Sequence, residues 1–327
     1  MPLSVNRTAR TELDSGGGPP PPENHARRPG GPLYGEAVTE ILLRDHLPGY
    51  PDAEQIAIGM QGAVFRLGGG TIAKVWFHAG TAELRLLADF YAALGKDGLT
   101  VRTPEILEVH EGSSYRVTVE AELPGVPLHS VAPHFGEPAR DCLLDVLGEL
   151  ATVTVRPELP VLDEVDPFRR PGQSWPDALK ELTVRRVERF RGKLGPAIHD
   201  LDGKVERLLR QLPDDGDGLV HGDVTAGNIL VDADCRPTSI IDFGLLTVSG
   251  DPAYDAATAS TMFALWDPGI REVEAAFDAA VVSRFGYEAE RLRTYRAIHM
   301  LLIANAHDDD PYGRDDAVGL AAALLNS

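Results

Sequence analysis

The chain has 327 residues, of which 43% are hydrophobic, and its formal net charge is −19. The length exceeds one average domain and suffices for two lobes with a sizeable core. A surface this negative repels phosphate backbones, so nucleic acid is not expected as a partner. It would attract a polycationic small molecule, although general solubility accounts for the charge as well.

Membrane insertion and secretion are not expected from the sequence. No apolar run is long enough to span a bilayer, and the N-terminus lacks the apolar core of a signal peptide. Two cysteines, Cys142 and Cys235, lie far apart in the sequence and are expected to be reduced thiols. These features together predict a cytoplasmic protein.

The first 32 residues are rich in glycine and proline, including Gly16–Gly18 and Pro19–Pro22. Such a segment cannot bury enough apolar surface to fold, so residues 1–32 are predicted to be a disordered leader. Apolar residues then recur at helical spacing, which predicts a short amphipathic helix over residues 35–47.

Two runs with β character follow, Gln55–Leu67 and Thr71–Phe77. The three glycines that join them, Gly68–Gly70, are typical of a hairpin turn and are not interpreted as a phosphate-binding loop. The better candidate for that loop is the turn flanked by Gly59 and Gly62, whose backbone N–H groups could lie over nucleotide phosphates.

Lys74 stands in an otherwise apolar strand, Ile72–Trp76. A buried ammonium group costs free energy unless it finds anions, so Lys74 is a candidate phosphate ligand. The alternative is an edge strand from which the lysine reaches water. Two further strands are predicted over residues 104–109 and 115–120, and helices over residues 138–153, 176–192 and 198–212, with a connector at 161–174.

The most informative stretch lies at residues 219–245. His221-Gly222-Asp223 precedes Asn228, which lies five positions after Asp223, and Asp242-Phe243-Gly244 begins fourteen residues after Asn228. Two oxygen ligands for Mg²⁺ and a separate carboxylate base are what phosphoryl transfer from a nucleotide requires. The spacing therefore predicts a nucleotide-dependent phosphotransfer site.

The pair of motifs, HGDxxxxN followed by IDFG, resembles the catalytic core of the aminoglycoside phosphotransferase family, which is related to the protein kinases. The resemblance covers roughly residues 50–300. It implies an α+β, bilobal, protein-kinase-like fold, with a β-rich N-lobe over residues 33–122 and a mostly helical C-lobe over residues 123–327.

The resemblance also assigns roles within the catalytic stretch. Asp223 is the expected catalytic base, and Asn228 and Asp242 are the expected Mg²⁺ ligands. His221 is expected to brace the loop through backbone hydrogen bonds. The run G-D-P-x-x-D ends at Asp255, which is expected to hold the catalytic loop through backbone N–H groups. This run follows Gly244 so closely that no long activation loop fits between them, which favours a small-molecule kinase over a protein kinase.

For the nucleotide, the resemblance implies that Lys74 binds the α- and β-phosphates and pairs with a glutamate of the next helix, for which Glu83 is the candidate. Main-chain groups near Ala121 and Leu123 are expected to bind the purine edge. Since backbone groups do this, the choice between ATP and GTP stays open.

The acceptor pocket is expected among the C-terminal helices, predicted at residues 291–305 and 315–325. Asp308, Asp309 and Asp310 could hold ammonium groups of a substrate, or could form a solvated acidic loop. Trp266 could line a sugar face, or could be core packing.

The predicted function is ATP- or GTP-dependent transfer of the γ-phosphoryl group, with Mg²⁺, to a hydroxyl of a small molecule. An aminoglycoside or related antibiotic is the first candidate acceptor, and the alternative is a metabolite such as a sugar, an amino alcohol or another natural product. A non-catalytic nucleotide-binding regulator is a third hypothesis, disfavoured because Lys74, Asp223, Asn228 and Asp242 are all present.

Overall fold

The computed structural model describes residues 49–326, apart from residues 60, 112–114, 165, 214–215, 264–268 and 306–315. The predicted leader and the predicted helix at 35–47 lie outside the described residues. So do four candidate acceptor residues, Trp266, Asp308, Asp309 and Asp310.

The first part of the described chain forms an antiparallel sheet in the order β1-β2-β3-β5-β4. Its strands are β1 (Glu54–Ile58), β2 (Gly62–Gly68), β3 (Thr71–Trp76), β4 (Ile106–Glu111) and β5 (Arg116–Ala121). The predicted run Gln55–Leu67 is thus two strands, β1 and β2, which pair antiparallel to each other. The predicted hairpin at Gly68–Gly70 is confirmed, and all three glycines have positive φ.

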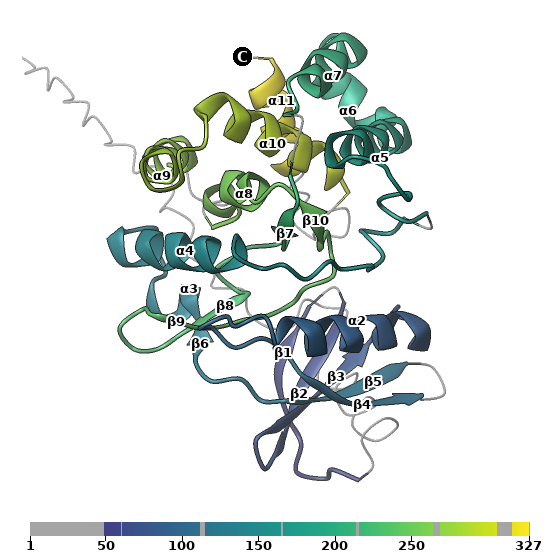
Figure 1. The fold of residues 1–327 in the computed structure, drawn as a ribbon, viewed down its shortest axis with the longest axis vertical. Coiled ribbons are helices and arrows are strands. Elements are labelled where there is room, and N and C mark those ends of the chain that lie inside the picture. The colour runs from purple at the N-terminus through teal and green to yellow at the C-terminus, as the bar shows by residue number, and fades with distance from the viewer. Residues whose placement is uncertain are drawn as a thin grey trace, which may run out of the picture.

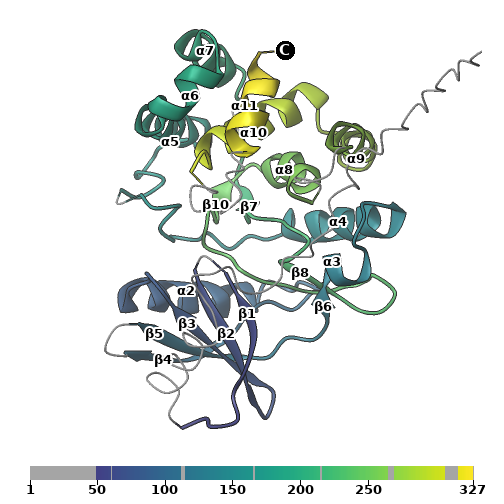
Figure 2. The ribbon, with the colours of Figure 1, turned by 180° about the vertical axis from the view of Figure 1, so that it is seen from behind.

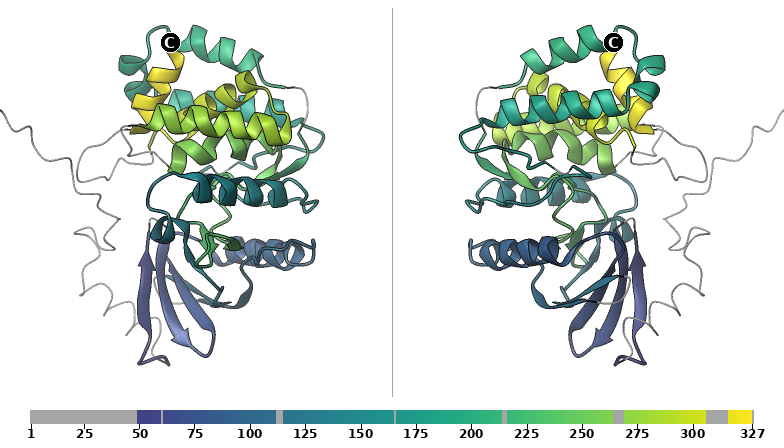
Figure 3. Two further views of the ribbon diagram at one scale, coloured as in Figure 1. Left: turned by 90° about the vertical axis from the view of Figure 1, so that its left-hand side faces the viewer. Right: turned by 90° about the vertical axis from the view of Figure 1, so that its right-hand side faces the viewer.

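The two faces of this sheet differ. Apolar side chains, among them Phe65 of β2 and Ala73 and Val75 of β3, form a compact cluster on one face. The alternate residues of β3, including Lys74 and Trp76, point to the other face. Trp76 joins the main core together with helix α2 (Thr81–Leu94), and α2 lies between the sheet and the rest of the molecule (Figures 1 and 3).

The chain leaves the sheet after β5 and enters a second, mostly helical lobe. Short β6 (Val126–Pro127) pairs with β8 (Ile229–Val231), which pairs with β9 (Pro237–Ile240). A second small sheet joins β7 (Gly218–Val220) to β10 (Val248–Gly250). The catalytic stretch connects these two ribbons, and Figure 2 shows β7 and β10 close to α5 and α8, with β6 and β8 nearer the N-lobe sheet.

The helices of this lobe surround the ribbons. They are α3 (Leu128–Val131), α4 (Glu137–Leu150), α5 (Trp175–Arg189), α6 (Arg191–Ala197), α7 (Leu201–Arg210), α8 (Ala253–Phe263), α9 (Ile270–Phe285), α10 (Ala289–Leu302) and α11 (Asp316–Leu325). The predictions at 138–153 and 198–212 correspond to α4 and α7. The one predicted at 176–192 is divided at Phe190 into α5 and α6.

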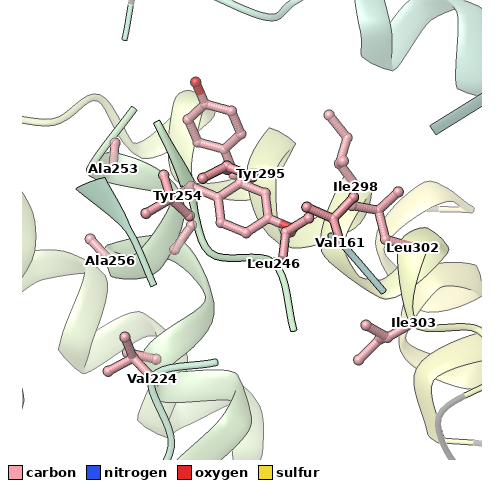
Figure 4. Close-up of a cluster of buried hydrophobic side chains, with 14 of the residues drawn as sticks. Val161, Val224, Leu246, Ala253, Tyr254, Ala256, Tyr295, Ile298, Leu302 and Ile303 are labelled. Atoms are coloured by element: carbon pink, nitrogen blue, oxygen red, sulfur yellow. The ribbon is translucent and has the colours of Figure 1, made fainter. Parts of the chain in front are cut away.

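The core of the helical lobe packs directly against the catalytic stretch, because Val224 and Leu246 belong to it. Figure 4 shows part of it, with Val224 from the catalytic loop, Leu246 from the segment after β9, Tyr254 from α8, and Tyr295 and Ile298 from α10. All five side chains are buried. The catalytic loop is therefore fixed by its packing against α8 and α10.

The α+β class with a β-rich first lobe and a helical second lobe is confirmed. Within the described ranges, no helix combines the length and apolar character needed to cross a membrane.

Candidate active site

The catalytic loop, residues 221–228, connects β7 to β8. Its conformation depends on Gly222, which has φ +79, a region that L-residues rarely adopt. A Cβ atom there would lie 2.6 Å from both Cβ and the carbonyl oxygen of Leu246. Glycine is therefore required by backbone conformation and by the close approach of Leu246.

Asp255, in the first turn of α8, holds the start of this loop through hydrogen bonds. Its carboxylate accepts hydrogen bonds from the backbone N–H of His221, at 2.7 Å, and of Gly222, at 2.8 Å. Burial raises the pKa of Asp255 to about 7, and the two N–H donors oppose that rise.

His221 lies fully buried and links the two motifs. Its Nδ1 accepts from the N–H of Asp223 at 3.2 Å, so Nε2 carries the proton and donates to the carbonyl of Ile241 at 3.1 Å. Burial lowers the pKa of His221 to about 4, so the ring is neutral at physiological pH. A neutral, fully bonded ring suits a bracing role and not proton transfer.

Asp223 and Asn228 lie side by side. Nδ2 of Asn228 donates to Oδ2 of Asp223 at 2.9 Å and to its carbonyl oxygen at 3.0 Å. The amide oxygen of Asn228, the atom of this side chain that can bind Mg²⁺, takes part in neither bond. The N–H of Ile241 donates to the Asn228 carbonyl at 2.9 Å, which brings Asp242 to the same place.

Asp242 is joined to Lys74 across 168 positions of sequence. Nζ of Lys74 lies 2.8 Å from Oδ1 of Asp242 and 3.3 Å from Oε1 of Gln61. Asp242 has φ +66, a conformation that non-glycine residues adopt at some cost and that is common at functional sites. The structure thus brings the lysine of the first lobe to the second acid of the motif.

The predicted pairing of Lys74 with Glu83 is corrected. Oε2 of Glu83 accepts from the N–H of Gly80 at 3.4 Å, as part of a capping box at the N-terminus of α2. The Glu83 side chain is exposed, and Lys74 contacts Asp242 instead. The reason is geometric: Glu83 lies in the first turn of α2, where free backbone N–H groups attract a carboxylate.

Phe243 packs at the junction of the lobes and is 1% exposed. Its ring centroid lies 5.6 Å from that of Phe90 and 5.9 Å from that of Tyr91, both on α2, and 4.3 Å from that of His221. These contacts tie α2 to the catalytic loop.

Thr247 is a residue that sequence reasoning missed. Its hydroxyl accepts from the N–H of Gly244 at 2.8 Å and donates to the carbonyl of His221 at 2.9 Å. It therefore connects the two motifs. A threonine three residues after the glycine could have signalled this, because threonine often bonds to nearby backbone.

Asp251, the first acid of the G-D-P-x-x-D run, joins the start of α8 to α10. Its Oδ1 accepts from the N–H of Ala253 at 3.0 Å, and its Oδ2 accepts from Nε of Arg291 at 2.7 Å and from the Tyr295 hydroxyl. Since Asp251 is almost fully buried, Arg291 supplies the charge that compensates it.

The two glycines of the turn between β1 and β2 differ in their surroundings. The N–H of Gly59 donates to the carbonyl of Gly62 at 2.9 Å. A Cβ at Gly62 would collide with the carbonyl oxygen of Val75, whereas a Cβ at Gly59 would meet open space. Gly62 is therefore needed for the packing of β2 on β3, whatever it binds.

The segment after β5 supplies the expected purine-binding backbone. The N–H of Ala121 donates to Glu105 at 3.1 Å, so at Ala121 only the carbonyl could meet a purine edge. Leu123 follows two residues later. The segment is fastened to β9 of the other lobe, because the hydroxyl of Thr238 donates to the carbonyl of Pro124 at 2.7 Å.

The residues present fit a magnesium ion that is shared with a nucleotide. Among the described residues, no group of three or more His, Cys, Asp or Glu side chains could bind a metal unaided. One carboxylate and one amide oxygen, from Asp242 and Asn228, suit Mg²⁺ because this ion commonly keeps phosphate and water ligands.

Comparison with known proteins identifies the family. Residues 52–297, more than half of the chain, match the phosphotransferase enzyme family, APH. The chain belongs to this family. It is accordingly a small-molecule phosphotransferase with a kinase-like fold. No curated protein sequence matches the chain.

Several solved structures of aminoglycoside phosphotransferases share the fold of this family member. A thermostable mutant of APH(4)-Ia with AMP-PNP and hygromycin B has 18% identity and a TM-score of 0.65, over 89% of this chain and 98% of that one. The GDP complex of aminoglycoside 2'-phosphotransferase-IIIa has 16% identity and a TM-score of 0.57, over 89% and 96%. APH(3'')-Id from Streptomyces rimosus, with ADP and streptomycin, has 18% identity and a TM-score of 0.55, over 81% and 98%.

Proposed function

We propose that this phosphotransferase moves the γ-phosphoryl group of ATP or GTP to a hydroxyl of a small molecule, with Mg²⁺ as the metal. The observation that carries the proposal is the meeting of two polar pairs. Lys74 lies 2.8 Å from Asp242, and Asn228 lies 2.9 Å from Asp223. The hydrogen bond from the backbone N–H of Ile241 to the carbonyl of Asn228 holds the two pairs next to each other.

Each of the four side chains has a distinct role in this proposal. Asp223 orients the acceptor hydroxyl and takes its proton. Asp242 and the amide oxygen of Asn228 hold Mg²⁺, which when bound neutralises charge on the phosphates. Lys74 binds phosphate oxygens, as its position beside Asp242 favours. His221 and Asp255 keep the loop in place.

The remaining nucleotide contacts are proposed for backbone groups. The turn between Gly59 and Gly62 would cover the phosphates, and the carbonyl of Ala121 with the N–H of Leu123 would bind the purine. These groups do not distinguish ATP from GTP by residue type, so both are proposed as donors.

We infer that the acceptor is an aminoglycoside or a related antibiotic, and that the enzyme acts in the cytoplasm as a resistance determinant. The similar structures bound to hygromycin B and streptomycin support this, as does the net charge of −19, which favours cationic acceptors. A non-antibiotic metabolite is the second candidate, because 16% to 18% identity carries the fold and not the acceptor.

The test is nucleotide consumption with Mg²⁺ against a panel of aminoglycosides, other antibiotics and amino sugars. Asp223→Ala is expected to bind nucleotide as the wild type does and to lose transfer by about 10²- to 10⁴-fold, the usual contribution of a general base. The matched control is Asp234→Ala, an exposed acid in the turn between β8 and β9, which should leave turnover unchanged. Full turnover in Asp223→Ala would remove the base from the proposal. Turnover with an antibiotic names the acceptor, whereas turnover only with a sugar or amino alcohol selects the second candidate.

A further inference from the structure

The anionic partner of Lys74 is not supplied by α2 in this protein. The two acids of that helix, Glu83 and Asp89, are both exposed, and Glu83 caps the helix N-terminus. In the structure Lys74 contacts Asp242, but Asp242 is also a proposed metal ligand. A separate carboxylate that stays in place would be needed to fix the ammonium group once the metal is bound.

Glu120 on β5 is placed to meet this need. Of the described carboxylates, four are buried, and Glu120 is the one within the N-lobe sheet. Lys74 lies directly opposite Thr118 in the β3–β5 pairing, and Ile72 lies opposite Glu120. Glu120 is therefore a diagonal neighbour of Lys74 on the same face of the sheet, within reach of a long side chain.

A chain of contacts runs beneath the lysine to this carboxylate. Nζ of Lys74 lies 3.9 Å from the ring centroid of Trp76. The indole N–H of Trp76 donates to the hydroxyl of Thr118 at 3.0 Å, and that hydroxyl donates to Oε1 of Glu120 at 2.5 Å. The partly buried cation is thus connected through the buried ring of Trp76 to the buried acid.

The electrostatics agree with the geometry. Burial raises the pKa of Glu120, and the Thr118 hydroxyl and the Lys74 ammonium group both act in the opposite direction. Asp242 adds a smaller effect that raises it. An acid this buried is costly unless a cation and a donor compensate it, and here Lys74 and Thr118 do so.

We propose that Glu120 is the positioning residue for Lys74, the fixed acid that holds its ammonium group toward Asp242 and the nucleotide phosphates. The inference rests on the proposed function, because Lys74 needs this orientation only if it binds a nucleotide. Glu120 itself touches no reacting atom. Glu120, on β5, thus has the role that was expected of Glu83, on α2.

The test measures the dissociation constant of a fluorescent ATP or GTP analogue, with Mg²⁺, on the full chain. Glu120→Gln keeps the shape and the acceptor for Thr118 but removes the charge, and should weaken binding about 10- to 100-fold with an unchanged or higher melting temperature. Glu83→Gln and the control Asp89→Asn should bind as the wild type does. Wild-type affinity in Glu120→Gln would overturn the inference.

A double-mutant cycle separates positioning from a merely structural role. In a Lys74→Ala background, Glu120→Gln should cause no further loss of affinity, because the residue it orients is gone. A loss of the same size in both backgrounds would refute the inference. If Glu120→Gln does not fold, the cycle is run with Glu120→Asp, which keeps the charge: it should retain part of the affinity, and a complete loss in this folded variant would count against a role for charge.

The inference and the proposed function fail in different ways. If the wild-type protein binds neither nucleotide analogue, the proposed function is wrong, and Glu120 has nothing to orient. If the wild type binds and Glu120→Gln binds equally well, only the inference about Glu120 is wrong.

Discussion

Replacing Gly222 by alanine perturbs the catalytic loop at a single atom. Gly222 has φ +79, and the added Cβ would lie 2.6 Å from Cβ and the carbonyl oxygen of Leu246. The left-handed conformation costs an alanine about 1–2 kcal/mol. Forcing an extra carbon against packed backbone costs about 1–3 kcal/mol more. The expected loss in the free energy of unfolding is therefore about 2–5 kcal/mol.

Gly69 provides the matched control for this change. It also has positive φ, at +62, but a Cβ there would meet no heavy atom within 4 Å. Gly69→Ala should therefore lose only the conformational part, about 1–2 kcal/mol. Urea unfolding at one pH, followed by circular dichroism, gives both values. Equal losses in the two variants would show that the contact with Leu246 does not constrain the loop.

The activity of Gly222→Ala gives a second readout of the same geometry. The new methyl group should displace the loop that carries Asp223, and a shift of about 1 Å at a reacting group costs about 100-fold in rate. Gly69→Ala lies in the hairpin between β2 and β3, so its turnover should stay close to that of the wild type.

Other substitutions and conditions should act as follows. Asp255→Ala leaves two buried backbone N–H groups without an acceptor and should cost about 2–6 kcal/mol in urea unfolding. Arg291→Met leaves the carboxylate of Asp251 buried without its cation and should cost about 3–5 kcal/mol, so stability close to the wild type would contradict the network. Burial lowers the folded-state pKa of His299 from 6.5 to about 4, so its contribution to stability is present above pH 6.5 and is lost as pH falls toward 4. His299→Asn should therefore show a shallower fall in the free energy of unfolding over that pH range than the wild type. Removal of Mg²⁺ with a chelator should abolish turnover and weaken nucleotide binding, and added Mg²⁺ should restore both.

Much of the fold was predictable because its signals are local. Glycines at a hairpin and apolar residues at helical spacing each depend on a few neighbouring positions. The hairpin at Gly68–Gly70 and helices α4 and α7 were found on this basis. The catalytic stretch was found for a similar reason, because the residue types that the reaction requires all lie within 25 positions of the sequence.

Other elements and contacts could not be predicted, because the residues that surround them come from distant parts of the chain. Helix α8 shows no amphipathic pattern, because its residues 253–261 are all buried. Lys74 pairs with Asp242, 168 positions away, whereas the sequence suggested the nearby Glu83, which instead caps the N-terminus of α2. The need for glycine at position 222 arises from its close approach to Leu246, 24 positions later, which the sequence does not show.

The packing of Phe243 has a consequence for inhibition. A compound that displaces this ring from its pocket would separate it from Phe90, Tyr91 and His221 at once. Loss of a buried phenylalanine costs about 3–5 kcal/mol, which any such compound must recover from its own contacts. Ligands that leave the ring in place and compete with the nucleotide avoid that cost. A chemical screen against this enzyme should therefore yield nucleotide-competitive compounds before it yields compounds that rearrange the motif.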